Sequence, residues 1–226
     1  MTIIPNRYHQ IYKLGFAIAI AFIFAISGCG IYAHTQDDED KSLSIDYSKF
    51  NTEATRNAAD KFFQAALDST KEKEKADNLK NAAAQYYILS NMNKADSYPC
   101  IQLARIYDLQ KNDAYAKAYF YRVLGLNYKD TDANFYFAEF YFTREQYEKA
   151  LEYYQKALTY GRPEDAQILK RIGQIYERFG DIPRASGYYK KSLNLNPKDT
   201  ELSRKINDNA AKEYENSGYY KRRLRN

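Results

Sequence analysis

This sequence has few residues whose side chains could take part in catalysis or bind a metal ion. The 226 residues include two histidines, His9 and His34, and two cysteines, Cys29 and Cys100. Residues 52–226 therefore hold no imidazole for a catalytic triad, a general base or a common type of metal site. Carboxylates are plentiful, but their spacing is that of solvated helix surfaces. The sequence predicts no catalytic residue, no metal site and no cofactor.

Cys29 stands at the end of an apolar run. A short segment with Arg7 and Lys13 but no acidic residue leads into the apolar residues 14–28, an order that is typical of a secretory signal. The last four residues of this region read Ile-Ser-Gly-Cys and resemble the lipobox of bacterial lipoproteins. That resemblance implies cleavage before Cys29 and attachment of lipid to its thiol.

A second interpretation of the N-terminus is an uncleaved membrane anchor. The apolar stretch can be extended from residue 14 to residue 33, which gives twenty residues and is long enough to span a bilayer. Both interpretations place the rest of the chain outside the cytoplasm, on the periplasmic or outer face of a bacterial membrane. Residues 29–51, which include the acidic run 37–40, are predicted to be a flexible tether.

Charge and composition favour a folded protein that does not bind nucleic acid. The chain has 34 basic and 29 acidic residues, and the two signs alternate along its length. One basic cluster stands near the C-terminus and is interpreted as a solvated tail: Lys221, Arg222, Arg223 and Arg225. With Cys29 consumed by processing, Cys100 is expected to be a small apolar core residue.

Three segments of the chain are similar to one another: residues 97–130, 131–164 and 166–199. Small and large residues recur at the same places in each segment. The eleventh place holds Tyr107, Tyr141 and Tyr176; the twentieth holds Ala116, Ala150 and Ala185; the twenty-fourth holds Phe120, Tyr154 and Tyr189. Large residues at helical spacing give each helix one apolar face, and small residues allow neighbouring helix axes to approach closely.

A period of 34 residues with this order of large and small side chains resembles the tetratricopeptide repeat. The resemblance implies an all-α, right-handed superhelical solenoid of antiparallel helix hairpins. The fourth place departs from the family, which usually has Trp there, because this chain has Cys100, Asn134 and Leu169. Residues 52–96 are expected to form a degenerate hairpin, and residues 200–226 a capping helix followed by the basic tail.

In the family, the first helices of successive repeats line a concave groove that binds partner proteins. The family's groove places fall here on residues of all three repeats, with Phe135 and Phe142 expected as exposed aromatic anchors. The predicted partner-binding residues are Tyr98, Ile101, Arg105, Phe135, Glu139, Phe142, Lys170, Gln174 and Arg178. The alternative is that the terminal helix or a second copy of the chain covers these two rings.

These observations predict a membrane-tethered scaffold that mediates protein–protein interaction at a bacterial cell envelope, with no enzymatic activity. Two other functions stay open. One is an accessory factor of an envelope hydrolase or glycan-binding system, which would need a polar cleft outside the repeat faces. The other is a purely structural homo-oligomer, which concentration-dependent mass in light scattering would reveal. The layout alone does not select between pathways.

Overall fold

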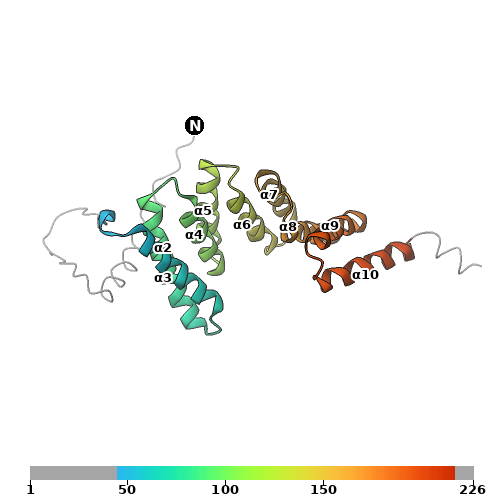
Figure 1. Ribbon diagram of the computed structural model, residues 1–226, viewed down its shortest axis with the longest axis horizontal. Coiled ribbons are helices and arrows are strands. Elements are labelled where there is room, and N and C mark those ends of the chain that lie inside the picture. Colours follow the sequence, from blue (N-terminus) through green and yellow to red (C-terminus); the bar gives the residue numbers. More distant parts are fainter. Residues whose placement is uncertain (1–44, 217–226) are drawn as a thin grey trace, which may run out of the picture. The chain divides into compact units, whose positions relative to one another are not determined.

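The computed structural model describes residues 45–216 (Figure 1). The predicted signal segment, the lipidation residue Cys29, most of the predicted tether and the basic tail lie outside these residues. Among the helices of the described part, none is both long enough and apolar enough to cross a membrane.

The chain divides into two compact units, and the division falls inside one helix, after Tyr119. The described part of the first unit contains the short 3-10 helix η1 and three complete helices, and it ends in the first half of α5. Their bounds are η1 Tyr47–Lys49, α2 Thr52–Asp68, α3 Glu72–Met92, α4 Ser97–Leu109 and α5 Asp113–Leu126. α2 packs antiparallel to α3, and α3 packs against α4 (Figure 1).

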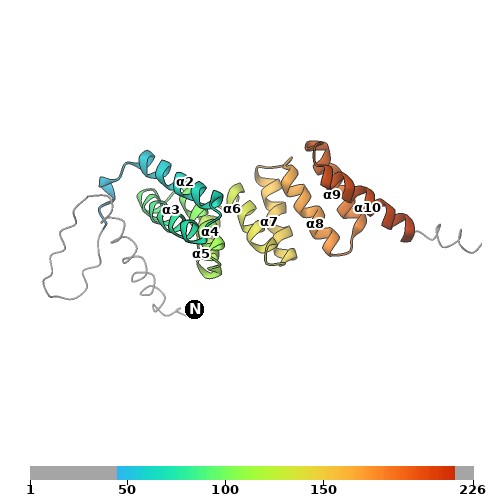
Figure 2. The same cartoon turned by 90° about the horizontal axis from the view of Figure 1, so that it is seen from below.

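The second unit contains the rest of α5 and five further helices. Their bounds are α6 Thr131–Phe142, α7 Tyr147–Tyr160, α8 Ala166–Arg178, α9 Ile182–Leu195 and α10 Thr200–Asn216. α6 pairs with α7 and α8 with α9; α7 also packs on α8, and α9 packs on α10 (Figure 2). The prediction of an all-α fold made of helix hairpins is confirmed for residues 45–216, which contain no strand.

An aspartate precedes each helix that opens a repeat. The carboxylates of Asp96, Asp130 and Asp165 accept hydrogen bonds of 2.9–3.0 Å from backbone N–H groups in the first turns of α4, α6 and α8. Asp199 does the same for Leu202 in α10, at 2.9 Å. Each carboxylate satisfies an N–H that would otherwise have no partner, which is why the helices begin at the same place in every repeat.

The small and large residues of the repeats meet in the core. Ala116, Ala150 and Ala185 are completely buried. At the eighth place of the third repeat, Gly173 on α8 lies against the ring of Tyr189 on α9, so a Cβ at Gly173 would come within 2.5 Å of ring atoms. This close approach fixes how α8 and α9 pack.

The fourth place of each repeat is buried although it lacks the family's Trp. Cys100 and Leu169 are 4% and 7% exposed, and the burial of Cys100 is as expected of a small core residue. Asn134 is fully buried, and its amide donates to the backbone carbonyls of Tyr128 and Asp130 at 3.0 and 2.7 Å. Asn134 therefore ties the start of α6 to the preceding turn.

In each repeat, the turn between the two helices contains a residue with positive φ at the fifteenth place of the repeat. These residues are Lys111 (φ 58°), Glu145 (φ 57°) and Gly180 (φ 76°). A side chain at positive φ collides with its own backbone, so glycine is the residue that fits this place without strain. Two of the three turns therefore carry a conformational cost that the third avoids.

Helix α10 ends the described repeats as a capping helix. Leu202 is fully buried, and Ile206 packs against the cluster of Ala185 and Tyr189 on α9. Glu201, Arg204 and Asp208 are exposed on other faces of the helix. One apolar face and several polar ones let a stack of hairpins end in water.

Candidate partner-binding groove

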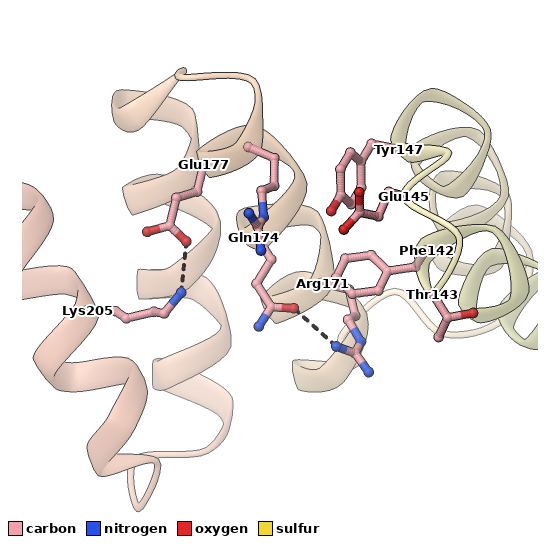
Figure 3. Close-up of a pocket in the computed structure, with 9 residues that line it drawn as sticks. Phe142, Thr143, Glu145, Tyr147, Arg171, Gln174, Glu177 and Lys205 are labelled. Carbon is pink, nitrogen blue, oxygen red and sulfur yellow. Dashed lines mark hydrogen bonds and ion pairs between the residues drawn. The ribbon is translucent and has the colours of Figure 1, made fainter.

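The second unit contains a groove of about 720 Å³ between α6, α8 and α10 (Figure 3). It is named the α6–α8–α10 groove, and the residues that line it are Phe142, Thr143, Glu145, Tyr147, Arg171, Gln174, Glu177, Arg178 and Lys205. In Figure 3, Phe142, Glu145 and Tyr147 lie together on one side, while Glu177 and Lys205 lie on the other.

Helical spacing explains why one face of α8 forms the floor of the groove. Arg171, Gln174, Glu177 and Arg178 are separated by three, three and one residues, which places them on one side of a helix. The end of α6, the turn after it and the start of α7 supply the aromatic wall. The opposite wall includes Lys205 of α10, which brings the capping helix into the site.

The α6 and α8 sides of the groove are held together by Arg171. Its guanidinium donates two hydrogen bonds to the carboxylate of Glu139 on α6, each of 2.9 Å. The hydroxyl of Tyr154 on α7 donates to the same carboxylate. Burial, followed by the negative charge of Glu139 and this hydrogen bond, raises the pKa of Tyr154 above its ordinary value.

The α8 and α10 sides are held together in a similar way. The ammonium group of Lys205 donates to Glu177 Oε2 at 2.8 Å, and the hydroxyl of Tyr189 on α9 donates to the same oxygen at 2.8 Å. Burial and the bond to Glu177 raise the pKa of Tyr189. The two arrangements are alike. In each, a buried tyrosine on the second helix of a hairpin (α7 or α9) donates to a carboxylate on the first helix (α6 or α8). That carboxylate pairs with a cation on the helix that follows the hairpin (α8 or α10).

The first unit contains a related arrangement. The hydroxyls of Tyr86 on α3 and Tyr98 on α4 both donate to Asp60 Oδ1 on α2, at 2.5 and 2.8 Å. Here a second tyrosine takes the position that a cation has in the second unit. Burial, followed by the hydrogen bond to Asp60, raises the pKa of Tyr86. A carboxylate shared between successive hairpins is thus a recurring structural element of this chain.

Two charged groups of the groove remain without such a partner. Among the side chains of residues 45–211, those of Glu145 and Arg178 form no hydrogen bond or ion pair, either with each other or with another residue. Both are exposed. Gln174 uses its carbonyl oxygen to accept a 3.2 Å bond from Arg171, which leaves its amide NH₂ free to donate. These three groups can interact with a bound molecule without breaking internal bonds.

Three of the predicted binding residues line this groove: Phe142, Gln174 and Arg178. Phe142 is half-buried, and the guanidinium of Arg171 covers its ring at 4.5 Å. Glu139 lies behind the floor, bound to Arg171. Lys170 is paired with Asp199 at 2.8 Å and with Glu201 at 3.7 Å, so it holds the start of α10.

The expectation of an exposed ring at Phe135 is wrong. Phe135 is 6% exposed, and the guanidinium of Arg162 lies over its ring at 4.7 Å. Arg162 is held there by ion pairs with Asp132 and Asp165. The repeat pattern puts this place on the groove face of the family, but it does not show that Arg162, from the turn before α8, covers the ring.

The remaining predicted residues belong to the first unit and lie outside this groove. Ile101 is 3% exposed and therefore contributes to the core, which corrects the expectation of an accessible side chain. Tyr98 is bound to Asp60. Arg105 stacks over Phe63 at 4.9 Å and donates to Gln102 at 2.7 Å. A binding role for Tyr98, Ile101 and Arg105 stays a prediction.

Six groove residues are absent from the list of predicted binding residues. Thr143 and Glu177 stand at groove places of the family, and the other four stand at none of these places: Glu145, Tyr147, Arg171 and Lys205. That prediction considers only the first helix of each repeat, whereas Glu145 and Tyr147 belong to the turn and to the start of the second helix. Lys205 is missed because α10 is expected to be only a cap. Its place in α10 matches that of Arg171 in α8, six residues after the capping aspartate, and this register is a usable signal.

Comparison with known proteins supports the repeat assignment. The family model of the tetratricopeptide repeat matches residues 131–198. Among solved structures, PilF of Pseudomonas aeruginosa is similar with a TM-score of 0.58 and 18% identity, covering 72% of each chain. MamA of Desulfovibrio magneticus RS-1 is similar with a TM-score of 0.59 and 14% identity, covering 77% of this chain and 92% of that one.

A third similar structure is YrrB, described as a tetratricopeptide protein with an unusual peptide-binding site. Its TM-score is 0.54 at 24% identity, and the match covers 58% of this chain and 68% of YrrB. No curated protein matches the chain. At these identities the structural similarities establish the fold alone.

Proposed function

Since the chain carries tetratricopeptide repeats, we propose that it is an interaction scaffold that binds an extended segment of a partner protein in the α6–α8–α10 groove. The observation that carries this proposal is that some polar groups of the groove are bound internally while others are available to a ligand. Arg171 and Lys205 are bound to internal carboxylates and hold the walls, while Gln174, Glu145 and Arg178 keep donors or acceptors available.

The available groups match the chemistry of an extended peptide. A peptide backbone presents a carbonyl and an N–H at every residue, and the free NH₂ of Gln174 can donate to such a carbonyl from the floor. The partly exposed edge of Phe142 and the ring of Tyr147 offer apolar contact to a side chain of the segment. YrrB, a structure of similar fold, has a peptide-binding site, which supports a peptide as the ligand class.

The groove is also preformed. Its walls are fixed by ion pairs of 2.8–2.9 Å, so little ordering is needed when a segment binds. Tetratricopeptide folds generally serve as non-catalytic scaffolds. Within residues 45–216, no group of three or more His, Cys, Asp or Glu side chains could hold a metal ion.

The proposal includes a tether at the N-terminus. Residues 1–28 and Cys29 have the order of a lipoprotein signal, so the repeats would be displayed on the extracytoplasmic face of a bacterial membrane. A scaffold held at a membrane surface meets its partner at a raised local concentration. A modest affinity in the groove is then sufficient for function.

Peptide selection tests the groove. The full chain in detergent micelles is used to select a phage-displayed library of random peptides, and the dissociation constants of selected peptides are measured by fluorescence polarisation. We expect Gln174→Ala to weaken binding about tenfold, because it removes a hydrogen bond made in a partly desolvated site. Gln155→Ala is the matched control, since Gln155 is exposed on α7 and lies outside the groove. Equal affinities for both variants would refute binding in the groove.

Membrane fractionation tests the tether. A Cys29→Ala variant of a lipoprotein keeps its signal uncleaved and incorporates no labelled fatty acid, whereas the wild type is cleaved and labelled. If the wild type is uncleaved and unlabelled but remains in the membrane fraction, the anchor is a transmembrane segment. Recovery of the wild type in the soluble fraction would refute both forms of tether.

A further inference from the structure

Glu145 occupies a backbone position that favours glycine. Its φ is 57°, and the corresponding residue of the next repeat is Gly180, with φ 76°. A non-glycine residue in this region carries a steric cost, as Lys111 also does at the same place of the first repeat. The Glu145 side chain forms no hydrogen bond or ion pair within the described residues, so no internal interaction offsets that cost. The carboxylate of Glu145 is therefore available to a bound molecule.

The surroundings of Glu145 are those of a site for a cation. Its carboxylate lies on the same side of the groove as Phe142 and Tyr147 (Figure 3). The ring of Tyr147 packs edge-to-face between Phe142, at 5.8 Å, and the exposed Phe179, at 6.4 Å. A carboxylate beside aromatic rings attracts an ammonium or guanidinium group through both its charge and the negative faces of the rings.

The cations that line this groove in the described part of the chain are not bound to Glu145. Arg171 is bound to Glu139 and Lys205 to Glu177, so both are already neutralised by other carboxylates. Arg178, on the floor, forms no ion pair with Glu145. The aromatic side of the groove thus presents one uncompensated negative charge to whatever binds there.

From this charge pattern we infer that the segment bound in the groove carries a basic side chain, lysine or arginine, whose cation binds to Glu145 beside Tyr147. This inference rests on the proposed function, because it specifies the chemistry of the same groove's ligand. Arg178, which has no ion pair among the described side chains, is left to interact with an acidic or carbonyl group of the segment. Because Glu145 is exposed, its contribution is expected to be modest, about fivefold in affinity.

A double-mutant cycle on the selected peptides tests the inference. The probes are groove-dependent peptides that contain one lysine, each paired with an analogue in which norleucine replaces that lysine. The protein variants are the wild-type full chain and Glu145→Gln, which keeps the size of the side chain and removes its charge. We expect each single change to weaken binding about fivefold. The two together should weaken binding no further than either alone, because both remove the same interaction.

A pair of glycine variants separates binding from backbone strain. Glu145→Gly and Lys111→Gly each remove a side chain from the same left-handed place, one at the groove and one in the first unit. Only Glu145→Gly should weaken the lysine peptides, and circular dichroism should show both variants folded.

The possible outcomes separate a failure of this inference from a failure of the proposed function. If Gln174→Ala weakens the peptides but Glu145→Gln leaves the lysine and norleucine forms equal, the basic-residue inference is refuted and groove binding stands. Selected groove-dependent peptides without lysine or arginine would also refute the inference and leave groove binding intact. If neither variant changes any affinity, the groove is not the binding site and both proposals fail.

Discussion

The guanidinium of Arg171 on α8 forms a bidentate pair with the carboxylate of Glu139 on α6, with two nitrogen–oxygen distances of 2.9 Å. Burial lowers the pKa of Arg171, but the hydrogen bonds and charge of Glu139 outweigh this and raise it overall. The pair joins two successive hairpins and at the same time forms the floor of the groove. Stability and binding geometry therefore depend on one contact.

Replacing Arg171 by alanine should destabilise the second unit. The change leaves the partly buried Glu139 carboxylate with only the Tyr154 hydroxyl as a partner, which costs about 2–3 kcal/mol. Arg171→Lys should recover part of this loss, because an ammonium group cannot form the two parallel bonds. Urea denaturation followed by circular dichroism measures both. Arg184→Ala is the control, since Arg184 is largely exposed and its pair with Asp181 should contribute much less to stability.

Gly173→Ala should destabilise the packing of α8 on α9. The added methyl group would lie 2.5 Å from the buried ring of Tyr189, and the overpacking costs about 1–3 kcal/mol. Gly187→Ala on α9 is the matched control. A Cβ there meets nothing within 4 Å, so the better helix propensity of alanine should raise stability by up to about 1 kcal/mol. Thermal unfolding of the two variants should shift in opposite directions, and shifts in the same direction would contradict the packing argument.

Glycine substitutions at the left-handed positions of the turns should stabilise the protein. Lys111→Gly and Glu145→Gly should each raise the free energy of unfolding by up to about 1 kcal/mol, because the steric cost of a side chain at φ 57–58° disappears. The reverse change, Gly180→Ala, should lower it by a similar amount. Chemical denaturation measures all three. A stabilising Gly180→Ala would show that this place does not demand glycine.

Alkaline pH should unfold the protein. Burial is the main cause that raises the pKa values of Tyr86, Tyr107, Tyr154 and Tyr189 in the fold, and it raises the pKa of Tyr153 to about 12. A raised pKa means that the folded protein holds the phenol proton more tightly than the unfolded chain does. The resulting stability is fully present below pH 10, the ordinary pKa of tyrosine, and declines above it.

The loss should amount to about 1.4 kcal/mol per pH unit for each phenol that stays protonated in the fold. Tyrosinate absorbance and circular dichroism, recorded together from pH 9 to 13, provide the measurement. We expect the absorbance of the buried tyrosines to appear together with loss of helix. Ionisation of these tyrosines while the helical signal is intact would contradict the prediction.

Much of the second unit follows from local rules that a sequence displays. The periodicity predicts helices over residues 132–143 and 147–160. The second range is that of α7, and α6 (Thr131–Phe142) differs from the first range by one residue at each end. The places of Ala150 and Ala185 in the core also follow from their spacing. The polar residues 71–78 are harder to assign, and they prove to lie mostly in the first two turns of α3, which begins at Glu72.

The repeating pattern can be read from the sequence: where helices begin, which faces are apolar and which places are small. These features depend on residues within one or two turns of each other. The long-range packing of the helices determines which charges are paired inside the protein and which stay available to a partner. Arg162 covers Phe135, and Arg171 binds Glu139, because side chains some thirty residues apart meet across neighbouring helices. No local pattern encodes such a meeting, and for that reason the prediction of an exposed Phe135 is wrong.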